Sequence, residues 1–193
     1  MLNNTLLNNF NFLNNKYFFV LCFYLKRHNV KIYNTLFIGY KYNYLFLNVN
    51  VFLKILRQNM ELIKIIARKN GNILFLYTEN KILNFLLKKN STKFHSFFLT
   101  NFVSKQANLL TYLNTLPDLV ISFDYQTNAI FLNKISKYNV PVLCFTNSLN
   151  TNIITNMFYY SIINNKSLYT NIILIYIIFN NIWTYKKILS YKY

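Results

Sequence analysis

The chain has few residues of the types that catalyse reactions or bind metals. It contains four acidic residues, two histidines and two cysteines: Glu61, Glu79, Asp118, Asp124, His28, His95, Cys22 and Cys144. Asp124 follows an apolar run of strand length, where a carboxylate could ligate a metal ion or accept a phosphoryl group, although capping of the next helix explains its position more simply. Both cysteines lie in apolar runs without CxxC spacing, and the histidines are isolated. We therefore expect buried free thiols and no metal site.

Glycine is too scarce for a nucleotide-binding loop. The sequence has only Gly39 and Gly71, whereas a Walker loop and a GxGxxG turn each need several glycines within a few residues. We therefore expect that the protein is not an enzyme, needs no cofactor and binds no small-molecule substrate. A nucleotide-binding α/β enzyme is the alternative.

The charge balance indicates a polyanionic partner instead. Lys and Arg total 21 against the four acids, giving a net charge of +17 over 193 residues. The preference for Asn, Ile, Lys, Phe and Tyr is typical of an AT-rich organelle genome, which favours lysine codons but does not by itself remove Asp and Glu. Such an excess of cations suits binding to RNA. The alternative is that the lysines form only a solvated surface.

The elements that must position these residues are clearest between the only two prolines. Residues 119–123 are an apolar, strand-length run, residues 127–138 have a helical pattern ending at Asn139, and residues 142–145 are a second buried run after Pro141. A strand–helix–strand unit of this size is a parallel, right-handed crossover. Because its strands are apolar on both faces, helices should cover both sides of the sheet.

The rest of the chain repeats this alternation. We predict strands at 44–49 and 72–78, a short strand within 154–163, and helices at 51–69, 81–90 and 168–183. Gly71 is expected to end the helix at 51–69 in the left-handed conformation. The prediction is a single doubly wound parallel sheet of the α/β class with helices on both faces. Its first 25 residues form an arm and lead-in segment, residues 26–183 form the domain, and residues 184–193 form a basic tail.

Three short segments carry a family resemblance: Leu-Pro-Asp at 116–118, Asn-Val-Pro-Val at 139–142 and Leu-Thr-Asn-Phe at 99–102. With the strands and helices around them, they resemble small-subunit ribosomal protein S-two. The resemblance implies a flavodoxin-like sheet. It also implies loss of the family's helical hairpin, because only residues 103–115 remain to make that connection.

The resemblance also implies contacts with ribosomal RNA. Thr100 and Asn101 belong to the Leu-Thr-Asn-Phe match, although capping of the next helix would also explain them. The expected RNA-binding residues are Lys26, Arg27, His28, Lys31, Lys41, Lys93, Thr100, Asn101 and Lys105.

The expected function is therefore that of a structural protein of an organellar small ribosomal subunit, bound to its ribosomal RNA and to neighbouring ribosomal proteins. Residues 1–15 contain no basic residue, unlike a mitochondrial presequence, as expected for a protein made inside the organelle. We expect a mitochondrial location, with a plastid as the alternative.

The longest apolar runs, 17–25 and 172–179, are about half of the ~20 residues that span a bilayer. We therefore expect no integral membrane protein, although a membrane-associated subunit is a further alternative.

Overall fold

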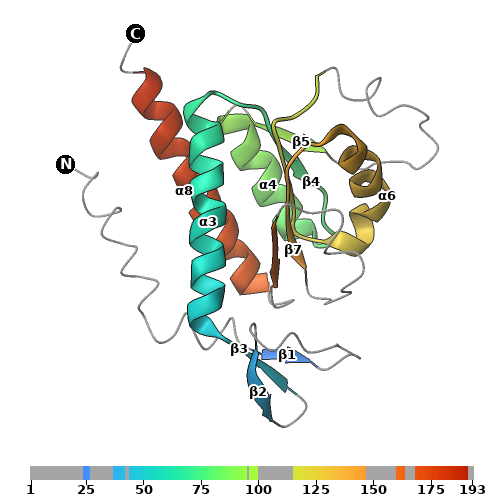
Figure 1. Cartoon of the computed structure of the whole chain (residues 1–193). Helices are drawn as coiled ribbons and strands as arrows, with labels where there is room; N and C mark the ends of the chain where they lie inside the picture. The colour runs from blue at the N-terminus through green and yellow to red at the C-terminus, as the bar shows by residue number, and fades with distance from the viewer. Residues whose placement is uncertain are drawn as a thin grey trace.

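The computed structural model describes residues 24–26, 37–41, 44–94, 96–99, 115–146, 160–163 and 168–190. Its main sheet has five parallel strands in the order β5-β4-β6-β7-β8 (Figure 1). These are β4 (Ile73–Leu76), β5 (Phe97–Leu99), β6 (Leu119–Ser122), β7 (Val142–Thr146) and β8 (Tyr160–Ile163). Numbered within the sheet, this is the order 2-1-3-4-5 of doubly wound flavodoxin-like folds. The predicted α/β class is confirmed.

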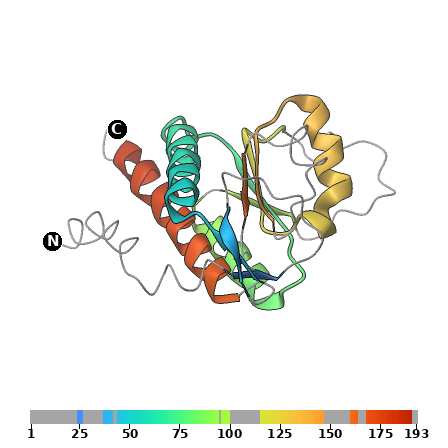
Figure 2. The same cartoon turned by 60° about the horizontal axis from the view of Figure 1, so that its bottom comes forward.

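Helices cover both faces of this sheet, as predicted. α3 (Val49–Arg68), α4 (Lys81–Lys93) and α8 (Leu168–Ser190) lie on one face, and α6 (Tyr125–Ile135) lies on the other (Figure 2). Alternate residues of β4 separate the two cores: Phe75 packs among the three helices, whereas Leu74 packs toward α6. Side chains alternate between the two faces along a strand, and each face is covered by helices, so the strands are buried on both faces.

A second, antiparallel sheet corrects the prediction of a single sheet. It contains β1 (Tyr24–Lys26), β2 (Phe37–Lys41) and β3 (Tyr44–Leu47) in the order β1-β3-β2, beside the N-terminal end of α3 (Figure 1). The strand predicted at 44–49 was therefore wrongly assigned to the parallel sheet. Only two residues separate β2 from β3, and a link this short can join antiparallel neighbours but not parallel ones.

The last helix also differs from its predicted length. α8 continues beyond the expected end at Trp183 as far as Ser190, so most of the predicted basic tail is helical. Residues 184–190 contain no Gly or Pro and include Lys and Leu, which favour helix. The N-terminal arm up to residue 23 and the connection at 103–114 lie outside the described residues.

Asparagine, rather than glycine, takes the left-handed conformation at two helix ends. Asn70 has φ 54° after α3, and Asn139 has φ 56° after the short 3₁₀ helix Ser136–Tyr138. The left-handed conformation predicted for Gly71 was wrong. A Cβ on Gly71 would lie 2.7 Å from Ile66 Cγ2 and 3.1 Å from Asp118 Oδ2. Gly71 is therefore required by close packing where α3 passes into β4.

We expect Gly71→Ala to lower the free energy of unfolding by about 1–3 kcal/mol, because the added methyl group meets a branch of the stiff Ile66 side chain. Asn70→Gly is the matched control, and it should change stability little because glycine adopts positive φ readily. Urea unfolding of both variants measures the difference. Equal stability of the two would show that the close approach at Gly71 is unimportant.

Candidate nucleic-acid interface

The carboxyl ends of β4 and β6 flank the point where the strand order reverses, which is the usual ligand site of this fold. Here the polar side chains bond to the protein itself. Asn128 is 6% exposed, and its Nδ2 donates to Tyr77 O at 2.7 Å and to Asp124 O at 3.0 Å. Asn84 accepts from Thr78 N at 2.8 Å and donates to Thr78 O at 2.6 Å. These bonds fasten the loops that follow β4 and β6.

The first turns of the helices at this edge are capped by side chains. Asn80 Oδ1 accepts from Ile82 N at 2.9 Å at the start of α4, and Asp124 Oδ1 accepts from Gln126 N at 3.0 Å at the start of α6. The predicted capping role of Asp124 is confirmed. Phosphates bind helix N-termini through free backbone N–H groups, whereas here the capping side chains already accept hydrogen bonds from some of these N–H groups. The Asp124 carboxylate would also repel an anion.

Cys144 lies on β7 beside this edge and is buried. Burial, together with the nearby Asp124 carboxylate, raises the pKa of its thiol to about 12 despite a hydrogen bond with Ser122. The thiol is therefore protonated and unreactive at neutral pH. The prediction of a buried free thiol is confirmed for Cys144, and Cys22 lies outside the described residues.

This pKa shift predicts a loss of stability in alkali. An unfolded thiol ionises near its ordinary pKa of 9.0, whereas the native thiol ionises near 12, so stability is fully present below about pH 9. It should fall as pH rises toward 12, at up to about 1.4 kcal/mol per pH unit. Cys144→Ala should remove this part of the slope, although the lost sulfur also lowers stability by a constant amount. If the free energies of unfolding of the wild type and of Cys144→Ala changed equally from pH 8 to 11, the raised pKa would be contradicted.

Basic side chains collect at the opposite, amino end of the strands. α3, α4 and α6 run antiparallel to the strands of the main sheet, so the C-termini of these three helices lie at this end of the sheet (Figure 1). We call the cations there the amino-end rim: Arg68, Lys69, Lys88, Lys89, Lys93, Lys134 and Lys137. All except the half-buried Lys134 are exposed. The helix dipole favours cations in the last turn of a helix, where Arg68, Lys93 and Lys134 lie.

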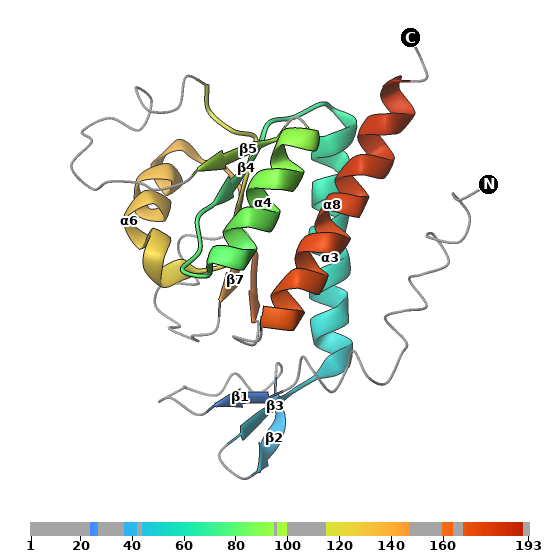
Figure 3. The same cartoon turned by 180° about the vertical axis from the view of Figure 1, so that it is seen from behind.

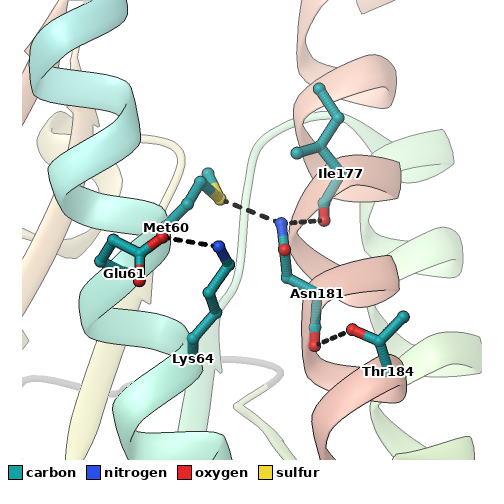
Figure 4. Close-up of polar contacts among 6 residues, drawn as sticks. All are labelled: Met60, Glu61, Lys64, Ile177, Asn181 and Thr184. Carbon is teal, nitrogen blue, oxygen red and sulfur yellow. Dashed lines mark hydrogen bonds and ion pairs between the residues drawn. The ribbon is translucent and has the colours of Figure 1, made fainter. Parts of the chain in front are cut away.

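Acidic side chains do little to neutralise this rim. All four acids of the sequence lie among the described residues, and only Asp118 is at the amino end, where its Oδ2 accepts from Asn72 N at 2.7 Å. Glu79 and Asp124 lie at the carboxyl end. Glu61 pairs with Lys64 at 2.6 Å on α3, beside α8 (Figure 4).

The packing of α3 against α8 helps to fix one part of the rim. The Arg68 guanidinium lies 4.6 Å from the centre of the Tyr185 ring on α8. Nearer the N-terminal ends of both helices, Asn181 Nδ2 donates to Ile177 O at 2.9 Å and lies 3.5 Å from Met60 Sδ (Figure 4). Cation–π contact orients Arg68 while leaving its charge exposed.

The structure places the expected RNA-binding residues in two separate regions. Lys26 on β1 and Lys41 on β2 are both paired with Tyr44 on β3, so they share one row of the small sheet. Lys93 belongs to the amino-end rim, beyond the far end of α3, a helix of 20 residues and therefore about 30 Å long. The other expected residues lie outside the described part of the chain: Arg27, His28, Lys31, Thr100, Asn101 and Lys105.

Most of the amino-end rim was missing from the predicted site. The basic ends of the helices were visible in the sequence, but they were not connected with one another. In a parallel α/β fold the C-termini of the helices lie at one end of the sheet. Basic residues near the ends of successive helices therefore predict a common basic surface.

The described residues hold no group of three or more His, Cys, Asp or Glu side chains placed to bind a metal ion. Within the same part of the chain, no helix has the length and apolar character needed to cross a bilayer. In comparisons with known proteins, no protein-family model and no curated protein matches this sequence.

Proposed function

We propose that the protein is a non-catalytic, RNA-binding structural component of the small subunit of an organellar ribosome, with mitochondria as the first location to test. The observation that carries this proposal is the convergence of seven cations at the amino end, with Asp118 as the one acid among them. Lysine and arginine side chains neutralise phosphates and release counterions, which supplies much of the affinity for RNA. Such contacts position a protein without reading sequence, as a structural ribosomal protein requires.

Two further features support the proposal. At the carboxyl end, where α/β enzymes bind ligands, the Asn84 and Asn128 amides are engaged in bonds within the chain. The Leu-Pro-Asp segment of the S-two resemblance also has a structural role: Asp118 bonds to Asn72 through both its backbone N–H and its side chain. These two bonds join the starts of β4 and β6, at the end of the sheet where the amino-end rim lies.

Sedimentation of native ribosomes tests this proposal. Organelle lysate is separated on a sucrose gradient, and the protein is detected with an antibody against the full chain. We expect it to peak with the small subunit and to move to the top of the gradient after ribonuclease treatment. A peak at the top without ribonuclease, or retention in membranes after carbonate extraction, would contradict the proposal. The second result would favour a membrane-associated subunit.

A further inference from the structure

The outer face of α8 carries a stripe of exposed aromatic side chains. Tyr169, Tyr176 and Trp183 are 70%, 62% and 38% exposed and recur every seven residues. Tyr169 and Trp183 are 14 positions apart, or about 21 Å along the helix. Residues 168–185 contain no charged side chain, which is unusual in a chain with a net charge of +17.

α4 extends this stripe into a wider surface. α4 and α8 lie side by side on the same face of the sheet (Figure 3), and Phe94 at the end of α4 stacks on Phe179 of α8 with ring centres 5.6 Å apart. Ile82 and Phe85 on α4 are 54% and 64% exposed. We call Ile82, Phe85, Tyr169, Tyr176 and Trp183 the α4/α8 surface. It holds half of the large hydrophobic side chains found exposed in the described part of the chain.

The composition of this surface is that of a protein interface rather than an RNA site. Centres of protein interfaces are enriched in Tyr, Trp and Phe and depleted in charge, whereas RNA binding needs cations beside the aromatic rings to meet successive phosphates. The spacing of seven residues along α8 is the repeat with which two helices pack at a shallow angle. The geometry therefore matches a partner helix that presents an apolar stripe of its own.

The charges bordering this surface define the partner further. Lys81, Lys88 and Lys89 lie exposed along α4, and Lys89 Nζ is 5.8 Å from the centre of the Phe85 ring. Neither α4 nor α8 contains an acidic residue. A second copy of this chain would bring another +17 of charge and would be repelled, whereas an acidic partner would be attracted.

We infer that the α4/α8 surface binds an acidic amphipathic helix of another protein, with the apolar stripe of that helix on Tyr169, Tyr176 and Trp183 and its carboxylates beside the α4 lysines. Helix-on-groove recognition of this kind uses apolar anchors at intervals of three, four and seven residues. The apolar anchors of this surface lie outside the amino-end rim, although Lys88 and Lys89 belong to both.

Trp183 is the only tryptophan of the chain, so its fluorescence reports directly on this surface. The probe is a tryptophan-free helical peptide of three heptads, with Leu at positions a and d and Glu at e and g. A second peptide has Lys in place of Glu. With the full-length protein, we expect the Glu peptide to shift Trp183 emission to shorter wavelength and to bind at least about tenfold more tightly than the Lys peptide.

The double variant Phe85→Ser/Tyr176→Ser should weaken binding of the Glu peptide by about tenfold or more. Ile130→Ser is the matched control, because Ile130 is 53% exposed on α6, on the opposite face of the sheet, and it should leave binding unchanged. Both variants should keep the wild-type affinity for ribosomal RNA. The inference is overturned by an unshifted Trp183 emission, by equal binding of the two peptides, or by an equal loss in the two variants. A Trp183 shift caused by single-stranded RNA and abolished by Tyr176→Ser would overturn it in favour of a nucleic-acid site.

Discussion

Replacing Lys88, Lys89 and Lys93 by glutamine should weaken binding to small-subunit ribosomal RNA on the order of 100-fold near 0.1 M salt. All three side chains are exposed in the C-terminal half of α4, in the amino-end rim. Each phosphate contact adds about 0.7 to 0.9 to the slope of log affinity against log salt. Loss of three contacts should therefore reduce that slope by about two units. Binding of a ribosomal RNA transcript over a range of salt concentrations gives both quantities.

A second triple variant separates the rim from net charge. Lys54, Arg57 and Lys81 are also exposed, but they lie on the first half of α3 and at the start of α4, away from the amino end. Changing all three to glutamine removes the same charge. We expect this variant to retain most of its affinity and most of its salt dependence. If the two triple variants lose affinity for RNA equally, long-range charge alone drives binding and the amino-end rim is not the RNA-binding surface.

The parallel sheet could be predicted because its signals are local and strong. β6 and β7 are short apolar runs next to the two prolines, and Asp124 marks the start of α6 by capping it. An apolar strand, a capped helix and a second apolar strand leave little choice except a parallel crossover. The apolar pattern also predicted a helix at 81–90, where α4 begins, and a short strand within 154–163, where β8 lies.

Other features depend on contacts that no local pattern encodes. β3 precedes a long helix, as a strand of the parallel sheet would, but pairing with β1 and β2 places it elsewhere. Gly71 resembles a helix stop, yet close packing is what requires it: a Cβ there would lie 2.7 Å from Ile66 Cγ2 and 3.1 Å from Asp118 Oδ2, which comes from a distant part of the chain. Asn59 is fully buried in α3, and no described residue forms a hydrogen bond with either of its side-chain amide atoms. In a chain so rich in asparagine, nothing in the sequence distinguishes it from its exposed counterparts.

The site was only partly predictable for a related reason. The excess of cations was evident from composition, and Lys93, one of the expected RNA-binding residues, is exposed. Lys69 and Lys137 lie at the same end of the sheet but come from other segments of the chain, so the grouping exists only once the strand order is known. The two regions that contain Lys41 and Lys93 are likewise separated by the length of α3, which sequence order does not reveal.

Asn128→Asp should be among the most damaging single substitutions in the described part of the chain, although it changes neither size nor shape. Asn128 Nδ2 donates to two carbonyl oxygens, Tyr77 O at 2.7 Å and Asp124 O at 3.0 Å. A carboxylate can only accept, so at neutral pH it would place a buried negative charge against two acceptors. We expect a loss of about 3 kcal/mol or more in the free energy of unfolding. Urea denaturation at pH 7 measures it.

The pH dependence of this variant identifies the cause. Burial and the facing carbonyl oxygens would raise the pKa of a carboxyl at position 128 above its value in the unfolded chain. A raised native pKa gives stability that is present at low pH and lost as pH rises through that pKa. Relative to the wild type, the Asn128→Asp variant should therefore recover part of its stability near pH 4, where a protonated carboxyl can donate one of the lost bonds. Asn133→Asp, at an exposed position of the same helix, should be nearly neutral at both pH values. If Asn128→Asp behaved like this control, the bonds from Asn128 would not be what holds the ends of β4 and β6 together.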